Sequence, residues 1–520
     1  MNTAGFLCKS LLDASWAGQL DVMKYLIDEQ HVDPSCRNKH GDTPLHFAAW
    51  NGQLEAVKYL IAEKRCNSML RGKYGRMLLH VATQRGHLDV IKYLIDECEV
   101  DPLCRDEHGN TPLHVAALGG QLEVVKYLIA EKHCSPMCEG QFDAAPLLLA
   151  CDNGDLGVIR YFIDEQQVDP SCQDKYGDTP LLCAALRGHL AVVQYLVTEK
   201  DCDPFCRGRG SLTPLHVATI SGNLDLIKYL IDEQQANPSC QDDQGCTPLH
   251  YAAEAGSLSL VKYLTAEKHC DPNCKSKRGI TPLHRVIKSE VASGLDVVKY
   301  LVDEQQVNPS CHDEDGYTPL HYAAISGQLS VVKYLVAEKH CDLKCKDRYG
   351  FTPLHLACVD PIRSGLDVIK YLIDEQHIDP SYRDEHNHDH DRNLLHFAAF
   401  AGSLSVVKYL ITEKHFNPMS KTELSKTPFH LACMSARALD VVKYLIDECQ
   451  IDPSCRDEVG DTALHYAALG GQLEVAKYLI MAKNSDPMCE NNLGTTPYAV
   501  AISEGHLELV KFFSKGMLPA

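Results

Sequence analysis

The chain of 520 residues contains 45% hydrophobic and 23% charged residues, a composition that can bury a core and that excludes intrinsic disorder. Fifty Lys and Arg against seventy Asp and Glu leave a net charge of −20, so we expect no attraction to nucleic acid or to anionic lipid. No stretch approaches eighteen uninterrupted apolar residues, and the first residues lack a basic leader, so neither insertion into a membrane nor a secretory signal is predicted.

A four-residue motif, TPLH, recurs along the chain at almost constant spacing. Successive motif starts differ by 34 residues from Thr43 to Thr281, and then by 37, 34, 41, 34, 35 and 34. The starts, degenerate copies included, are Thr43, Met77, Thr111, Ala145, Thr179, Thr213, Thr247, Thr281, Thr318, Thr352, Asn393, Thr427, Thr462 and Thr496. A copy without the motif begins at Lys9, so the chain holds fifteen units. This pattern predicts a single array over 1–520, with a regular block at about 9–280, irregular units at about 281–392 and a C-terminal block at about 393–515.

Each unit predicts two helices followed by a turn. In the unit of Thr43, the threonine is a good N-cap and Pro44 suits the first helical position, where its missing N–H has no partner to lose. Gly52 ends this first helix. The apolar faces of the two helices consist of Leu45, Ala48 and Ala49, and of Leu54, Val57, Leu60 and Ile61. The second helix stops before Asp-Pro, because the residue before proline avoids the α region, and the segment that follows is rich in turn residues.

These features together resemble the ankyrin repeat family over nearly the whole chain. The resemblance is carried by TPLH-x-A-A, by the glycine nine residues after Thr43 and by the LEVVKYL helix at 122–128. It implies an all-α repeat solenoid, a curved and elongated stack of helix-turn-helix units with β-turn finger loops. One departure stands out: the family closes its second helix with Gly-Ala-Asp, whereas this chain has DEQHVDP or AEKHCDP, one residue longer. The exit path of the second helix therefore stays open.

A second period of about 68 residues lies on top of the first. The second helix ends alternately in an acidic DEQ or DEC segment and in a Glu-Lys pair. The acidic ends begin at Asp28, Asp96, Asp164, Asp232, Asp303, Asp374 and Asp447, and the lysines are Lys64, Lys132, Lys200, Lys268, Lys339 and Lys414. We infer that a block of two repeats was duplicated.

The histidines and cysteines that recur in single columns are expected to be structural. Eleven units carry His in the fourth motif position, and leucine or alanine replaces it freely in others, so a local hydrogen-bonding role is favoured over catalysis. Eleven of the 24 cysteines lie seven residues before the motif and behave as small buried hydrophobes. The pair Cys270 and Cys274 has zinc-like spacing but lacks a second ligand pair, so no cofactor is predicted. Free thiols favour a reducing, cytoplasmic location, with a nuclear one as the alternative.

An insertion between 281 and 392 breaks the regular pattern. The segment DEHNHDHDRN places His386, His388 and His390 among carboxylates. Two interpretations stay open: a site for a divalent metal, or a solvated and lengthened finger loop, which is the favoured one. No metal site is therefore predicted. Longer turns at 288–296 and 358–367 accompany this insertion, and the irregular units are expected to open before the regular ones.

Catalytic motifs are missing from the sequence: GxxxxGK[ST], HExxH and GxSxG do not occur. Because fifteen repeats leave no room for a catalytic domain, we expect no catalytic residues and no enzymatic activity. The resemblance implies a scaffold or adaptor that binds one or more protein partners. The alternative is the ankyrin arm of a larger assembly, such as the cytoplasmic domain of a channel or the substrate receptor of a ubiquitin ligase.

Two outward-facing columns are predicted to bind the partner. The residue before the motif, at the finger tip, is apolar in five consecutive units: Leu212, Cys246, Ile280, Tyr317 and Phe351. The residue seven positions after the motif start, on the concave helix face, is apolar in most units and includes Trp16, Trp50, Leu118, Leu186, Ile220, Ile325 and Phe400. Each column has an alternative interpretation. The finger tips could instead fold against neighbouring fingers, and the two tryptophans could instead cap the core of the first units.

Overall fold

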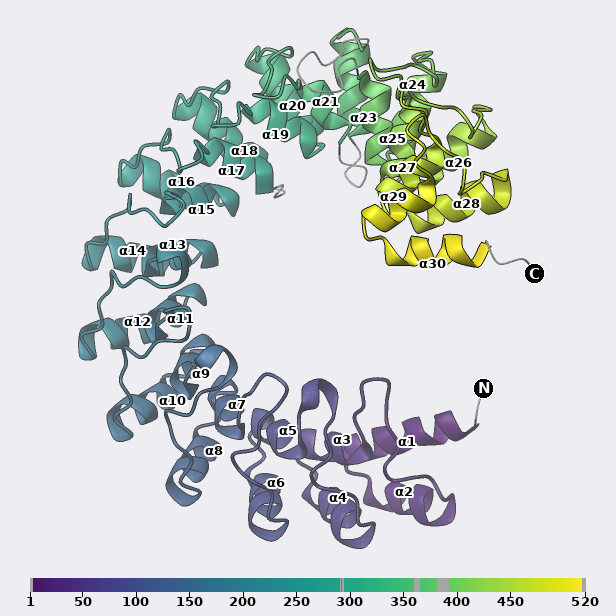
Figure 1. Cartoon of the computed structure of the whole chain (residues 1–520). Coiled ribbons are helices and arrows are strands. Elements are labelled where there is room, and N and C mark those ends of the chain that lie inside the picture. Colours follow the sequence, from purple (N-terminus) through teal and green to yellow (C-terminus); the bar gives the residue numbers. More distant parts are fainter. Residues whose placement is uncertain (1–2, 290, 292–293, 360–364, 381–391, 517–520) are drawn as a thin grey trace. The chain divides into compact units, whose positions relative to one another are not determined.

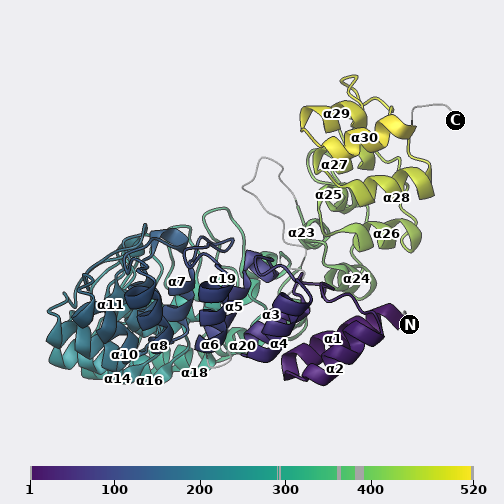
Figure 2. The ribbon, with the colours of Figure 1, turned by 90° about the horizontal axis from the view of Figure 1, so that it is seen from below.

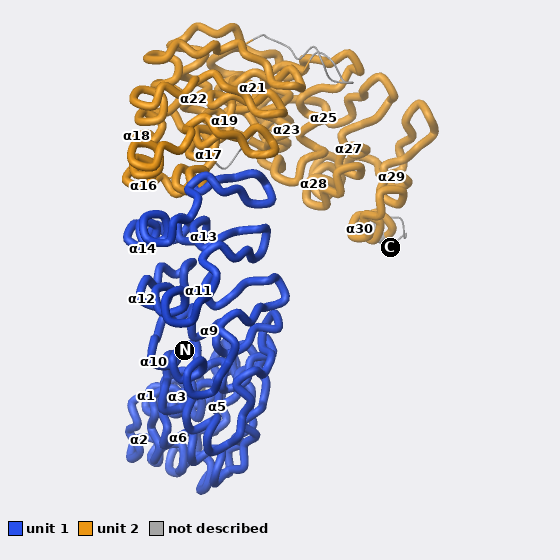
Figure 3. Tube along the Cα trace, turned by 90° about the vertical axis from the view of Figure 1, so that its left-hand side faces the viewer, with its two compact units in different colours: residues 1–248 blue, residues 249–520 orange. Residues whose placement is uncertain are grey.

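A computed structural model describes residues 3–289, 291, 294–359, 365–380 and 392–516, and the chain divides into two compact units, 1–248 and 249–520 (Figures 1 and 3). Each predicted repeat forms two helices that pack on one another. The described residues contain no β-sheet, only isolated bridges between Arg71 and Met77 and between Arg456 and Thr462. This architecture confirms the all-α repeat solenoid.

In unit 1 the first helices of successive repeats pack side by side and line the inner side of the unit, while the second helices line the outer side (Figure 1). The first helices are α1 (Thr3–Ala17), α3 (Pro44–Trp50), α5 (Leu78–Arg85), α7 (Pro112–Leu118), α9 (Pro146–Asn153), α11 (Pro180–Leu186) and α13 (Pro214–Ser221). The second helices are α2 (Leu20–Lys24), α4 (Leu54–Lys58), α6 (Leu88–Lys92), α8 (Leu122–Lys126), α10 (Leu156–Arg160), α12 (Leu190–Gln194) and α14 (Leu224–Lys228).

Unit 2 repeats the same pairing, and its pairs α27/α28 and α29/α30 lie one above the other (Figure 2). Its first helices are α15 (Pro248–Glu254), α17 (Pro282–Ser289), α19 (Pro319–Ile325), α21 (Pro353–Ala357), α23 (Leu394–Ala401), α25 (Pro428–Met434), α27 (Ala463–Leu469) and α29 (Pro497–Ser503). Its second helices are α16 (Leu258–Lys262), α18 (Gly294–Lys299), α20 (Leu329–Lys333), α22 (Leu366–Lys370), α24 (Leu404–Thr412), α26 (Leu439–Asp447), α28 (Leu473–Lys483) and α30 (Leu507–Gly516).

The histidine column joins the first helices that carry it to the finger that follows. In α7 the backbone N–H of Thr111 donates to Nδ1 of His114 at 3.2 Å, so the ring proton lies on Nε2, which donates to the carbonyl of Ala144 at 3.1 Å. The ring is fully buried, and burial lowers the pKa of His114 to about 4, which keeps it neutral at pH 7. This geometry confirms a structural role for the column, because most of its imidazoles contact backbone groups of two repeats, as His80, His321 and His465 also do.

The longer exit of the second helix is accommodated without glycine. In eleven repeats the helix ends in a π-helical turn of five residues, as in η5 (Tyr127–Glu131), where the N–H of Lys132 reaches the carbonyl of Tyr127 at 3.2 Å. The next residue, His133, adopts a left-handed conformation with φ of 53°. The other ten π-helical segments are η1 (Tyr25–Glu29), η2 (Tyr59–Glu63), η4 (Tyr93–Glu97), η7 (Tyr161–Glu165), η8 (Tyr195–Glu199), η10 (Tyr229–Glu233), η11 (Tyr263–Glu267), η12 (Tyr300–Glu304), η13 (Tyr334–Glu338) and η14 (Tyr371–Glu375). Short 3₁₀ turns occur in three fingers, η3 (Lys73–Gly75), η6 (Gln141–Asp143) and η9 (Arg209–Ser211).

The period of 68 residues has a structural basis in a three-residue cluster that links the two repeats of a block. The hydroxyl of Tyr127 donates to Asp96 of the preceding repeat at 2.9 Å, and Lys132 forms an ion pair with the same carboxylate. Equivalent clusters within the two units are Tyr59–Asp28–Lys64, Tyr195–Asp164–Lys200, Tyr334–Asp303–Lys339, Tyr409–Asp374–Lys414 and Tyr478–Asp447–Lys483. The acidic and basic ends of alternate helices are therefore the two halves of one contact.

The predicted division of the array into regular, irregular and C-terminal blocks remains a prediction. The insertions on which it rests fall largely at residues 290, 292–293, 360–364 and 381–391, outside the described residues. His386, His388 and His390 lie in the last of these segments, so the metal and loop interpretations of that insertion both stay as stated above.

Candidate interaction surface

The helix-face column lies at the protein surface, as its position in the repeat predicts. Trp16 is 42% exposed, and Leu186 and Ile220 are exposed to the same extent. The other exposed members are Leu118, Val359, Phe400 and Leu469, and the half-buried members are Trp50, Ile325 and Met434. Large apolar side chains left exposed at one repeat position mark an interaction surface more clearly than scattered ones do.

The finger-tip column is less accessible than the sequence suggested. Cys246 is only 1% exposed, so its proposed contact role is wrong, and Leu212, Ile280, Tyr317 and Phe351 are half-buried. The reason is the histidine column: His216 Nε2 lies 3.2 Å from the carbonyl of Cys246 and His321 Nε2 lies 3.1 Å from that of Phe351, which draws each residue against the preceding repeat.

The aromatic members of the finger-tip column show the same inward packing. The rings of Tyr317 and Tyr322 lie 5.6 Å apart between centroids, and those of Phe351 and Phe397 lie 5.4 Å apart. The rings of Tyr317 and Phe351 therefore pack on residues of the first helices α19 and α23, whereas the stated alternative was packing against neighbouring fingers. Partner contact by the remaining tip residues stays a prediction.

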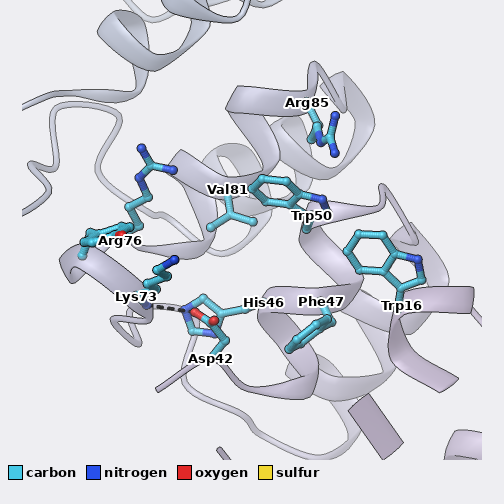
Figure 4. Close-up of a pocket in the computed structure, with 10 residues that line it drawn as sticks. Trp16, Asp42, His46, Phe47, Trp50, Lys73, Arg76, Val81 and Arg85 are labelled. Carbon is cyan, nitrogen blue, oxygen red and sulfur yellow. Dashed lines mark hydrogen bonds between the residues drawn. The ribbon is translucent and has the colours of Figure 1, made fainter. Parts of the chain in front are cut away.

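One pocket joins both columns in the first three repeats (Figure 4). Its volume is about 370 Å³. Helices α1, α3 and α5 and the fingers between them supply its walls: Trp16, Asp42, His46, Phe47, Trp50, Lys73, Tyr74, Arg76, Val81 and Arg85. A concave site with a mostly apolar lining and a few convergent polar groups is typical of a binding site. We call it the N-terminal pocket.

Aromatic rings form the apolar part of the N-terminal pocket. Trp16 and Phe47 meet edge to face with centroids 6.1 Å apart, and the guanidinium of Arg85 lies 4.6 Å from the ring centroid of Trp50. Neither tryptophan is a buried cap of the core, because Trp16 is exposed and Trp50 is half-buried. The two tryptophans therefore offer ring surface to a ligand.

Charged groups surround these rings. Lys73, Arg76 and Arg85 supply three positive charges and Asp42 one negative charge, which leaves a net charge of +2 because the buried His46 has a lowered pKa and is neutral. Asp42 accepts the backbone N–H of Lys73 at 2.8 Å (Figure 4). The pocket is therefore basic in a protein whose net charge is −20.

Sequence reasoning missed the basic side of this pocket, since Lys73 and Arg85 lie outside both columns, and Arg76, although it precedes a motif, was not among the predicted contact residues. A signal was nevertheless present: residues 64–88 contain six Lys and Arg and no Asp or Glu. In a chain with a large acidic excess, such a run marks a local reversal of charge.

A second pocket of about 240 Å³ lies in the same repeat register within unit 2. Two carboxylates face it; Asp457 accepts the hydroxyl of Tyr466 at 2.7 Å, and Asp461 lies 3.8 Å from His465. Its lining comprises Leu424, Lys426, Asp457, Val459, Asp461, His465, Tyr466, Leu469 and Val500. The position before the motif carries Asp42 and Arg76 in the N-terminal pocket and Lys426 and Asp461 in this one, so the repeat position alone does not set the charge of a pocket.

Stacked helix pairs joined by fingers define a helical repeat protein. A sequence profile described as ankyrin repeats (3 copies) matches residues 11–106, 63–140, 132–207, 203–276, 257–347, 283–384, 382–457 and 429–517, so the chain belongs to the ankyrin repeat family. Comparison with curated proteins finds no match. Ankyrin repeats are in general protein–protein interaction modules and are typically non-enzymatic.

Among the described residues, no group of three or more His, Cys, Asp and Glu side chains is arranged to hold a metal ion. No helix in the same part of the chain is both long and apolar enough to cross a membrane.

Proposed function

We propose that the protein is a non-enzymatic scaffold or adaptor that binds a protein partner through the exposed apolar column on its first helices. The observation that carries this proposal is the recurrence of exposed large apolar side chains at one repeat position. Such recurrence is what a long, repetitive binding surface requires. We further propose a cytoplasmic location, with free cysteines, and no binding to nucleic acid, since the net charge is −20.

A partner must contact several repeats at once to form a stable complex. Burying the exposed remainder of one such side chain stabilises a complex by roughly 1–2 kcal/mol, whereas association costs on the order of 4–15 kcal/mol. A partner must therefore cover at least three or four apolar members of the column, which Gln84 and Asp152 interrupt in unit 1. Unit 1 offers Trp16, Trp50, Leu118, Leu186 and Ile220.

A triple variant, Leu118→Ser with Leu186→Ser and Ile220→Ser, tests this proposal. The matched control places serine at Leu103, Met137 and Phe205, which lie in the turns after the second helices and are somewhat more exposed than the three test residues. Cross-linking capture followed by mass spectrometry should show partners that bind the native protein and the control but not the triple variant. Equal capture by both folded variants would contradict the proposal.

A further inference from the structure

The N-terminal pocket contains a buried donor without an acceptor. His46 is 3% exposed, and its Nδ1 accepts the backbone N–H of Thr43 at 3.2 Å, so the ring proton lies on Nε2. This Nε2 has no hydrogen-bond partner among the described residues. In the next repeat His80 Nε2 lies 3.0 Å from the carbonyl of Asn110, and the backbone of Arg76 takes the equivalent place beside His46 without forming the same close contact. A buried N–H without an acceptor is costly, so the site is suited to a ligand that supplies one.

A second donor in the same pocket is also unpaired. Arg76 donates through Nη1 to the side chain of Gln84 at 2.9 Å, but its buried Nε has no partner among the described residues. Arg76 lies on the finger, while His46 lies on α3, and both line the pocket. These two N–H donors come from different repeats and line a pocket whose charged side chains, Asp42 included, sum to +2, which favours an oxygen anion.

The rings beside these donors limit the ligand further. Trp16 is exposed and Phe47 is half-buried next to it, so an apolar side chain can pack on them while a charged neighbour reaches the donors. A volume of about 370 Å³ lies at the lower end of ligand sites, which span roughly 300–1,000 Å³, and so accommodates one or two side chains.

We propose that the N-terminal pocket binds an acidic peptide segment of the partner, in which one carboxylate accepts the N–H groups of His46 and Arg76 and an adjacent apolar side chain packs on Trp16 and Phe47. This inference rests on the proposed function and assigns the ligand chemistry of one part of the surface. A single carboxylate fits better than a polyanion, because the net charge of −20 repels an extended chain of phosphates.

The chain provides its own probe, since its only two tryptophans, Trp16 and Trp50, both line the pocket. The experiment is a titration of the full chain, followed by tryptophan fluorescence, with acetyl-Gly-Phe-Glu-Gly amide. The same peptide with Gln or with phosphoserine in place of Glu is titrated in parallel. The Glu peptide should give a saturable change, and the Gln peptide should bind about tenfold more weakly or worse, because hydrogen bonds to a charged acceptor are stronger.

A pair of variants with the same change in charge assigns the contact. Arg76→Gln should weaken binding of the Glu peptide about tenfold, whereas Arg65→Gln, in the same basic run but outside the pocket, should leave it within about twofold. If Arg76→Gln fails to fold, the comparison of the Glu and Gln peptides on the native chain still decides.

Three results would overturn the inference: no saturable change up to about 10 mM peptide, equal affinity for the Glu and Gln peptides, or binding of the phosphoserine peptide alone. None of these bears on the variants at Leu118, Leu186 and Ile220. Loss of capture by that triple variant, together with failure of the peptide titration, would preserve the proposed function and reject only the ligand assignment.

Discussion

The contact between the two repeats of a block predicts that stability alternates along the chain. Within the block formed by the third and fourth repeats, Tyr127 is 3% exposed and donates to Asp96, whose side chain is 38% exposed. The tyrosine of the following repeat, Tyr161, is equally buried at 5% but has no side-chain hydrogen bond among the described residues. Tyr127→Phe and Tyr161→Phe therefore remove the same hydroxyl group from two nearly equivalent places.

The magnitude follows from the exposure of the acceptor. A hydrogen bond to a charged group contributes roughly 1.5–3 kcal/mol when its loss leaves a buried group unpaired. Because water can reach Asp96 and replace the lost donor, we expect Tyr127→Phe to lower the free energy of local opening by only about 0.5–1.5 kcal/mol. Tyr161→Phe should change it by no more than a few tenths of a kcal/mol.

Hydrogen exchange of the full chain, measured by mass spectrometry, reports local opening without requiring that all fifteen repeats unfold together. Amides of α8 and η5 should exchange about two- to tenfold faster in Tyr127→Phe than in the native protein, since 1.4 kcal/mol corresponds to a factor of ten. The proposed stabilisation of the block by the Tyr127–Asp96 hydrogen bond would be refuted by either of two results. One is an equal acceleration of exchange around Tyr161 in Tyr161→Phe, and the other is unchanged exchange around Tyr127 in Tyr127→Phe.

Three further predictions concern pH, backbone strain and thiol chemistry. The pKa of Asp96 is lowered, first of all by its hydrogen bond with Lys132. The Asp96 carboxylate therefore stabilises the block fully above its ordinary pKa of about 3.8, and this stabilisation is lost as the pH falls through the lowered pKa. Hydrogen exchange in this block should accelerate in that pH range, and Asp96→Asn should abolish the pH response. His133→Gly should raise the free energy of local opening by about 0.5–1 kcal/mol, because glycine adopts the left-handed conformation without a steric penalty. Faster hydrogen exchange around residue 133 in the variant than in the native protein would disprove this. Burial raises the pKa of Cys358 to about 12 and raises that of Cys151 well above its ordinary value, so both thiols should resist a disulfide reagent at pH 8 until the protein unfolds. Labelling of either thiol in the folded protein would contradict its burial.

The sequence by itself determined the helix pairs, the start of most first helices and the family, whereas it left the end of the second helix open. Those features depend on residues close together in the chain: Thr111 and Pro112 start a helix, and the apolar spacing of Val124, Val125 and Leu128 selects the face that is buried. The exposure of Trp16 and Leu186 was predictable for the same reason, because every repeat places this position on the same face of its first helix.

Tertiary structure alone decided the features that join different repeats. Cys246 is buried because its carbonyl contacts His216, thirty residues earlier, and Asp96 meets Tyr127 across thirty-one residues. The N-terminal pocket combines Trp16 with Arg76, sixty positions apart. Such contacts depend on how one repeat is rotated and translated onto the next. Side-chain spacing within one repeat carries no information about this geometry, because it describes a single helix pair and not the stacking of two.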